Sequence, residues 1–284
     1  MNVRIIIDST ADVTPEIKEK VTVIPMHLYF GDEEYIDGVS LTYKQFYEKL
    51  IEYDEMPRTS QANPDMFINA FKEVHEKGEK AVVITLASTL SGTYQNALIA
   101  AEDYEDSIYV VDSKNATIGS GILVELAVKL AEQGMEAKEI ADTLIREREN
   151  ICLMGMVDTL EYLRKGGRIS KTAAVAGELL SIKPVLCVRD GKIEVLGKAR
   201  GSKKANNYLI QEITKAGGID FKMPLLLGYG GLTDVLLQKY IEDSRAIWEG
   251  NTDHLNCSCI GSVIGTHLGP GSVAIAFFKN QKDK

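Results

Sequence analysis

Three short polar segments of this sequence combine hydroxyl, imidazole and glycine residues in a way that suits a small anion. They read Thr-Ser-Gln at residues 59–61, Thr-Leu-Ser-Gly-Thr-Tyr at residues 89–94 and Gly-Thr-His-Leu-Gly-Pro-Gly at residues 265–271. Each lies in or beside a turn-prone stretch next to an expected strand or helix, where hydroxyls and unpaired N–H groups are free to face a ligand. We therefore predict that the three segments form one site.

Ser91 and Gly92 give the clearest chemistry of the three segments, because they follow an expected strand and open an expected helix. The first N–H groups of a helix are unpaired and carry the positive end of its dipole, so a carboxylate or phosphate fits there. A purely structural interpretation stays open for each segment. Ser91 suits a helix cap, Thr59 a polar turn, and His267 an ordinary surface position.

Two arginines flanked by glycine, Arg168 and Arg200, are candidates for a charged contact to the anion. A guanidinium keeps its charge at any working pH and holds a carboxylate or phosphate with two parallel hydrogen bonds. Both arginines lie in basic segments, at residues 164–168 and 198–204, whose lysines are typical of solvated surface.

A serine hydrolase with Ser91 as nucleophile and His267 as base is the enzymatic alternative. The sequence before Ser91 lacks the first glycine of a GxSxG turn, and no acid is placed next to His267 by the sequence. The chain also contains no Walker A motif, no HExxH motif and no cluster of metal-ligating residues. We accordingly expect no metal and no cofactor.

The composition is that of an ordinary soluble protein of about two domains, with 284 residues, 45% of them hydrophobic. A formal net charge of −9 argues against nucleic acid and anionic membrane surfaces as general partners. The sequence shows no signal peptide and no apolar stretch of about 20 residues, so no integral membrane segment is expected. The four cysteines lack CxxC spacing, which favours reduced thiols and a cytoplasmic location.

Residues 1–150 alternate between apolar strand patterns and helix signals. Strands are expected at 3–7, 81–86 and 108–111, and a hairpin is expected within 21–37. Helix starts are indicated by four local signals, which are Thr14-Pro15, the Thr42 and Gln45 capping box, Asn63-Pro64 and Gly92. Two further helices fill 117–150. This alternation predicts an N-terminal α/β domain with a mostly parallel sheet and covering helices.

Residues 151–284 show more strands and fewer helices. Strands are expected at 152–157, 184–188, 193–197, 224–229, 254–261 and 273–278. The Asp-Gly pair at residues 190–191 predicts a tight hairpin between two of them. We therefore predict a second domain of α+β class with a more antiparallel sheet.

Five motifs in order resemble those of the DegV family. They are Asp-Ser-Thr-Ala-Asp at residues 8–12, Thr-Ser-Gln at 59–61, Leu-Ser-Gly-Thr-Tyr-Gln-Asn-Ala at 90–97, Gly-Gly-Arg-Ile at 166–169 and Ile-Gly-Thr-His-Leu-Gly-Pro-Gly at 264–271. The resemblance covers essentially the whole chain. It implies a two-domain α/β fold in which a long-chain fatty acid binds, with its carboxylate at the domain junction and its acyl chain in a buried tunnel.

The resemblance also implies roles for particular residues. Thr59 and Ser91 would bind the carboxylate through hydroxyls, Gly92 through its amide and His267 through its imidazole. Arg200 matches a family arginine near the head group. Some members are the carrier subunit of a bacterial fatty acid kinase, so a separate ATP-dependent kinase is the expected protein partner and no catalysis is expected here. A binding protein for another small anion and the serine hydrolase remain the alternatives.

A carboxylate buried without partners costs several kcal/mol, so the head group needs donors. We expect hydroxyls, helix N–H groups and a protonated His267 to supply them. Apolar contacts to the acyl chain are expected from residues 118–130, 157–163 and 182–188.

Overall fold

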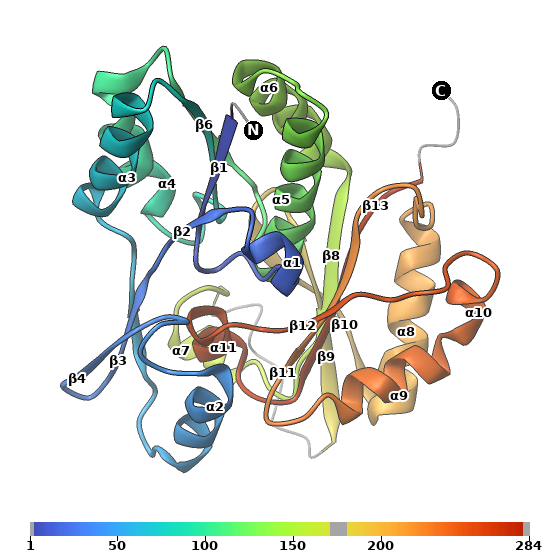
Figure 1. Ribbon diagram of the computed structural model, residues 1–284. Coiled ribbons are helices and arrows are strands. Elements are labelled where there is room, and N and C mark those ends of the chain that lie inside the picture. The colour runs from blue at the N-terminus through green and yellow to red at the C-terminus, as the bar shows by residue number, and fades with distance from the viewer. Residues whose placement is uncertain (1–2, 171–180, 281–284) are drawn as a thin grey trace.

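The computed structural model describes residues 3–170 and 181–280. Within those residues the chain forms a mixed α/β fold with three sheets of four, six and three strands. The four-stranded sheet is parallel, and the six-stranded sheet is mostly antiparallel. The larger two lie in different halves of the molecule, with helices between and around them (Figure 1). The predicted fold class is confirmed.

The parallel sheet has the strand order β2-β1-β6-β7. Its strands are β1 (Val3–Asp8), β2 (Thr22–Ile24), β6 (Lys80–Thr85) and β7 (Ile108–Asp112). Helices cover both faces, which explains why β1 and β6 are almost continuous runs of buried β-branched residues. Strand residues alternate between the two faces, so Ile6 packs in the cluster with α3 (Pro64–Glu76) and α4 (Thr93–Ala101). Ile5 and Ile7 pack in the cluster with α5 (Thr117–Glu132) and α6 (Ala137–Glu147).

These covering helices begin where the sequence places their signals. Their bounds are α3 (Pro64–Glu76), α4 (Thr93–Ala101), α5 (Thr117–Glu132) and α6 (Ala137–Glu147). The Asn63 side chain accepts a hydrogen bond from the Met66 N–H at 3.1 Å and caps α3. Two single turns of 3-10 helix, Glu102–Tyr104 and Arg148–Asn150, follow α4 and α6.

A small antiparallel sheet lies below the parallel sheet and consists of β4 (Glu33–Ile36), β3 (His27–Phe30) and β5 (Arg58–Ser60). The hairpin between β3 and β4 is the one predicted around residue 31, where Gly31 has a φ of 60°. Helix α2 (Tyr43–Glu52), which has the predicted capping box, packs in one hydrophobic cluster with β3. Helix α1 (Pro15–Lys18), capped by Thr14, instead packs Ile17 into the cluster that contains β1 and α5.

The six-stranded sheet has the order β10-β9-β8-β13-β11-β12, and only β11 and β12 are parallel to each other. Its strands are β8 (Ile151–Met156), β9 (Ile182–Arg189), β10 (Lys192–Arg200), β11 (Leu225–Gly230), β12 (Cys257–Cys259) and β13 (Ser272–Phe278). Asp190 and Gly191 both have positive φ values, 49° and 74°, as the predicted Asp-Gly hairpin turn requires.

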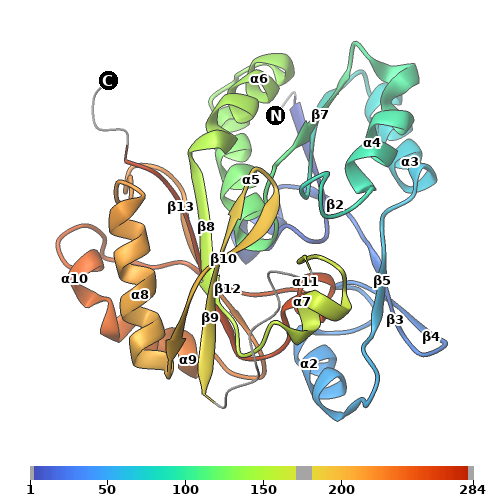
Figure 2. The same cartoon turned by 180° about the vertical axis from the view of Figure 1, so that it is seen from behind.

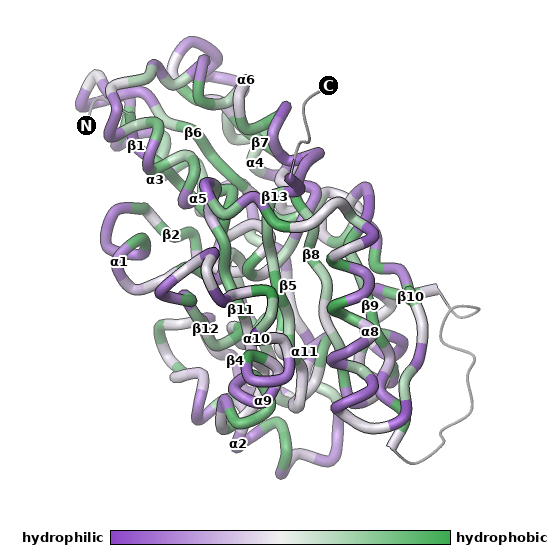
Figure 3. Tube along the Cα trace, turned by 90° about the vertical axis from the view of Figure 1, so that its right-hand side faces the viewer, coloured by the Kyte–Doolittle hydropathy of each residue, from purple (hydrophilic) through white to green (hydrophobic). Residues whose placement is uncertain are grey.

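Three helices cover the outer face of this sheet, namely α8 (Ser202–Lys215), α9 (Val235–Asp243) and α10 (Arg245–Trp248) (Figure 2). Helix α5 packs against its inner face and, on its other side, against β1 and β6 of the parallel sheet. A helix enclosed in this way is apolar over most of its surface, and 12 residues of α5 are buried. Figure 3 shows the contrast with α8, whose tube carries purple hydrophilic segments beside green ones.

Two sequence-based expectations for residues 151–284 are wrong. The strand expected at 254–261 is only the three-residue β12, and the segment expected to be a glycine-rich turn at 265–271 begins inside a helix, α11 (Ser262–Leu268). Among its described residues, the 151–284 half contains five helices, which are α7 (Glu161–Lys165), α8, α9, α10 and α11. The domain boundary expected between residues 150 and 151 stays a prediction. In the part of the chain that is described, no helix is long and apolar enough to cross a membrane.

Candidate functional site

A cavity of about 400 Å³ lies where α4, α5, α7, α11 and the six-stranded sheet meet, which is within the usual size of small-molecule sites. Polar side chains line one end of it and aliphatic side chains line the remainder. We call five of these polar positions the polar end of the cavity, and they are Thr59, Ser91, Gly92, Arg168 and His267. The cavity thus joins the three segments that the sequence predicts to form one site.

Thr59 and His267 are in direct contact across the polar end. The Thr59 Oγ1 and His267 Nε2 atoms are 3.0 Å apart, although 208 residues separate them in the sequence. Thr59 lies on β5, where it pairs with Leu28 of β3, and His267 lies in the last turn of α11. The small sheet and α11 therefore bring together a hydroxyl and an imidazole that the sequence could only suggest separately.

Ser91 and Gly92 lie at the start of α4, on the same cavity wall. Gly92 is the N-cap residue, and the Ser91 Oγ accepts a hydrogen bond from the Thr93 N–H at 3.3 Å. A Cβ atom at residue 92 would collide with the side chain of Gln61, so glycine allows Gln61 to pack closely there. Ser91 is therefore not the N-cap residue itself, although its hydroxyl accepts from the first N–H group of the helix and also lines the cavity.

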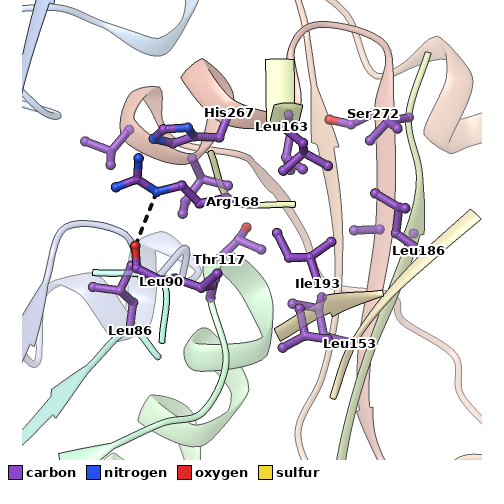
Figure 4. A pocket seen from close by; sticks show the side chains of 18 of the residues that line it. Leu86, Leu90, Thr117, Leu153, Leu163, Arg168, Leu186, Ile193, His267 and Ser272 are labelled. Carbon is purple, nitrogen blue, oxygen red and sulfur yellow. Dashed lines mark hydrogen bonds between the residues drawn. The ribbon is translucent and has the colours of Figure 1, made fainter. Parts of the chain in front are cut away.

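Arg168, not Arg200, is the arginine at this site. Its Nε donates to the Leu90 carbonyl at 3.3 Å and its Nη1 to the Gly166 carbonyl at 2.6 Å, which holds the guanidinium on the cavity wall (Figure 4). The prediction of Arg200 as a head-group ligand is wrong for this structure. Arg200 is exposed at the end of β10, an edge strand, where its side chain lines a separate surface hollow with Lys204.

His267 is neutral at neutral pH. Burial, and secondly the positive charge of Arg168, lower the pKa of the His267 imidazole to about 4. The expectation of a protonated His267 is therefore wrong for the ligand-free protein. A neutral ring with its proton on Nε2 donates to Thr59 Oγ1, and the Thr59 hydroxyl hydrogen is then free to face a ligand.

A titration of the four histidine rings by NMR should identify His267 by its pKa of about 4. The sequence has only three other histidines, His27, His75 and His254, so the spectrum is simple. The His267→Gln variant assigns the signal because it lacks only that ring. Titration of the His267 ring near the ordinary histidine value of 6.5 would show that this imidazole is solvated rather than buried.

The apolar part of the cavity comes mainly from the six-stranded sheet and α11. Figure 4 shows Leu153, Leu163, Leu186 and Ile193 around the same space. The expected contributions from 157–163 and 182–188 are found in part, since Val157, Leu163 and residues 186–188 line the cavity. The expected contribution from 118–130 is not found. Those α5 residues pack between the two sheets, and only Ala116 and Thr117, at the helix start, reach the cavity.

The geometry does not match a serine hydrolase. In a catalytic triad, one ring nitrogen contacts the serine and an acid holds the other. Here the Nε2 atom contacts Thr59, while Ser91 Oγ lies 3.0 Å from Thr93 Oγ1. The buried Nδ1 of His267 has no hydrogen-bond partner among the residues described. The same part of the chain contains no group of three or more His, Cys, Asp or Glu placed to hold a metal ion.

Comparison with known proteins decides the family. A family model described as "Uncharacterised protein, DegV family" matches residues 2–280. A DegV domain-containing protein of Clostridium perfringens is 34% identical over 283 residues, which cover 97% of this chain and 98% of that protein. The chain belongs to the DegV family.

Solved structures of DegV proteins share the whole fold. A structure described as fatty acid binding of a DegV family protein from Thermus thermophilus has a TM-score of 0.87 and 28% identity, with 98% of this chain and 100% of that chain covered. The Fatty Acid Kinase (Fak) B3 protein of Streptococcus pneumoniae, loaded with linoleic acid, has a TM-score of 0.85 and 26% identity, with 99% and 100% covered. The description of the first structure thus names fatty acid binding, and that of the second names a bound fatty acid.

Within the DegV motifs, sequence reasoning identified Thr59, Ser91, Gly92 and His267 as residues of one site, and the structure brings these four to one cavity. It weighed Arg168 and Arg200 as candidates for the charged contact, and the family resemblance then favoured Arg200. The signal that could have identified Arg168 is its place in the 166–169 motif, where the chain after α7 turns back toward Leu90. Gly167 has a φ of 71° at this turn.

Proposed function

We propose that this protein binds one long-chain fatty acid, with the carboxylate at the polar end of the cavity and the acyl chain along its apolar lining. The observation that carries the proposal is the single cavity that joins hydroxyl, imidazole and guanidinium groups to a wall of leucine, isoleucine, valine and methionine side chains. A fatty acid has the same division between one charged end and a long apolar remainder. The ligands of the two DegV relatives support the assignment.

At the polar end, the Thr59 and Ser91 hydroxyls and the Gly92 amide would donate hydrogen bonds to the carboxylate. Hydrogen bonds to a charged group contribute about 1.5–3 kcal/mol each, and together they offset the loss of hydration on burial. Neutral His267 would act by orienting the Thr59 hydroxyl. Arg168 supplies the positive charge nearby, as its effect on the pKa of His267 indicates.

The acyl chain would supply most of the affinity. Each buried CH₂ group contributes about 0.8 kcal/mol before the ordering of the chain is subtracted. The lining side chains come from β8, β9, β10, β13 and α11, so the tail would extend along the inner face of the six-stranded sheet. A small anion such as phosphate would leave this apolar wall without a partner.

We further propose that the protein is a carrier that presents the fatty acid carboxylate to a separate ATP-dependent fatty acid kinase. The support is the Streptococcus pneumoniae relative, which is described as the B3 protein of such a kinase. No catalytic base is required of the carrier, because the kinase would transfer the phosphoryl group. Acyl phosphate should form only when the loaded protein, ATP and a fatty acid kinase subunit are combined.

The first experiment is native mass spectrometry of the purified protein, followed by denaturing extraction and mass analysis of the released material. We expect one fatty acid per chain, in the range of about 14–18 carbons that the resemblance to the DegV family implies, and we expect it to stay bound through its many CH₂ contacts. If the protein is recovered empty, titration with palmitate should restore one ligand per chain. A protein that is empty and rejects palmitate, or that binds acetate or phosphate as tightly, would contradict the proposal.

A further inference from the structure

Helix α11 determines much of the geometry of the cavity. It contributes Val263, Ile264, His267 and Leu268 to the lining, although it has only seven residues and is about 10 Å long. A helix this short has little stability of its own, so its position depends on tertiary contacts.

Two buried aspartate side chains hold the N-terminal end of α11. The Gly261 N–H donates to Asp12 Oδ1 at 2.9 Å, and the Ser262 N–H donates to Asp37 Oδ1 at 3.2 Å. Asp12 is 3% exposed and Asp37 is 2% exposed. The first helical N–H groups lack partners within the helix, so these bonds serve as caps supplied from a distant part of the chain.

The approach of Asp12 depends on the absence of a side chain at residue 261. A Cβ atom there would lie 3.0 Å from Asp12 Oδ1 and 3.3 Å from the Tyr43 hydroxyl. The Tyr47 hydroxyl donates to the Ile260 carbonyl at 3.0 Å and fixes the preceding residue. The start of α11 is thus held at three consecutive residues by groups that precede residue 50.

Asp12 also contacts a residue that lines the cavity. Its Oδ2 accepts a hydrogen bond from the hydroxyl of Thr117, which lines the cavity at the start of α5. Thr117 has a φ of 46°, a left-handed conformation that is strained for a β-branched residue. Such strain persists only where the surroundings fix it, and the bond to Asp12 is one such constraint.

We propose that Asp12 and Asp37 are positioning residues that fix α11 from its N-terminal end and so hold His267 against Thr59 at the polar end of the cavity. Neither aspartate side chain lines the cavity, and both act through backbone N–H groups about one helix length from the imidazole. Without them the short helix would shift or fray, water would reach the His267 ring, and the Thr59 contact would loosen. The effect on fatty acid affinity rests on the proposed function, whereas the effect on His267 does not.

The test compares Asp12→Ala and Asp37→Ala with Asp12→Asn, whose amide oxygen can still accept from the Gly261 N–H. The matched control is Leu144→Ala, which removes a fully buried side chain on α6 and lowers stability without touching α11. Two quantities are measured in each variant, the pKa of His267 by NMR in the ligand-free protein and the dissociation constant for palmitate.

We expect both alanine variants to raise the pKa of His267 by at least about one unit and to weaken palmitate binding about tenfold or more, since water would enter the site. Asp12→Asn and Leu144→Ala should leave both quantities close to those of the unaltered protein. Alanine variants that leave the His267 titration unchanged would overturn the proposal. If only palmitate fails to bind, in every protein including the unaltered one, the proposed function fails and the positioning role stands.

A further measurement covers the case in which the alanine variants do not fold. Hydrogen exchange of the Gly261 and Ser262 amides in the unaltered protein reports the two bonds directly. We expect both amides to be protected to the level of neighbouring buried strands, because they are paired to buried acceptors. Exchange as fast as that of an exposed loop would overturn the proposal.

Discussion

A protein that carries both Thr59→Val and Ser91→Ala will bind palmitate at least about 100-fold more weakly than the unaltered protein. Each substitution removes one hydroxyl donor to the carboxylate, and a hydrogen bond to a charged group contributes about 1.5–3 kcal/mol. Two such losses come to at least about 3 kcal/mol, and each 1.4 kcal/mol is a factor of ten. Valine keeps the shape and strand propensity of threonine at residue 59.

Isothermal titration with palmitate measures this change, and a thermal unfolding curve verifies that the variant folds. The matched control is Thr22→Val with Ser107→Ala, which removes a strand hydroxyl and a loop hydroxyl away from the cavity. Unchanged affinity of the Thr59 and Ser91 variant would place the carboxylate elsewhere. Loss of an ester-hydrolysing activity in Ser91→Ala alone would instead support the hydrolase alternative.

The second large effect is a change in how stability depends on pH. Burial raises the pKa of Asp12 from 3.8 to about 8, against the opposing effects of its hydrogen bonds to Thr117 and Gly261 and of the Lys18 charge. Between those two pH values the folded protein holds a proton that the unfolded chain has released. Raising the pH therefore lowers the free energy of unfolding, by about 1.4 kcal/mol per pH unit for this one group.

The Asp12→Asn variant cannot titrate at this position, so it should lose that part of the pH dependence. His267 has the opposite sign, because its lowered pKa makes stability rise with pH between about 4 and 6.5. The clean window is therefore pH 6.5 to 8. Over it, the free energy of unfolding should fall by about 2 kcal/mol more in the unaltered protein than in Asp12→Asn.

Denaturant unfolding at several pH values in this window measures the difference. The pKa values of the buried Asp8 and Asp37 carboxyls are also raised by burial, but both residues are present in the two proteins and their effects largely cancel. Asp103→Asn, which replaces an exposed aspartate, is the control and should follow the profile of the unaltered protein. Parallel profiles for Asp12→Asn and the unaltered protein would contradict the prediction.

The sequence predicted those parts of the fold that local signals determine. The caps at Thr14, Thr42 and Asn63 are made by side chains within three residues of the N–H groups they bind, so they can be recognised without a structure. The Asp-Gly hairpin turn at residues 190–191 is equally local. The alternation of strand and helix signals before residue 150, and the smaller number of helices after it, then separated the parallel sheet from the antiparallel one.

Helix α11 was missed because its cap is not local. Gly261 occupies the N-cap position and has no side-chain capping bond, and the bonds come instead from Asp12 and Asp37, more than 200 residues away. Gly265 further obscures the pattern, although it serves close packing against Phe46 and Tyr47. Sequence reasoning therefore read residues 265–271 as a turn while still identifying His267 as a site residue.

Sequence reasoning also favoured Arg200 over Arg168 for the charged contact, although Arg168 lies in the 166–169 motif. Both arginines follow a turn or strand end next to glycine, and only the folded chain shows that one faces the cavity and the other faces solvent. The apolar lining of the cavity was predicted only in part, for a related reason. An apolar helix such as α5 has the same sequence pattern whether it lines a cavity or packs between two sheets.

The position of α5 has a consequence for how the two halves of the chain depend on each other. One continuous hydrophobic cluster runs from β1 and β6 through α5 to β8, β11 and β13. Both large sheets pack their inner faces against α5. The buried residues of the two halves of the chain therefore belong to one hydrophobic cluster. We therefore expect the two sheets to unfold together, and we expect the cavity, which residues from both halves of the chain line, to form only when both sheets are assembled.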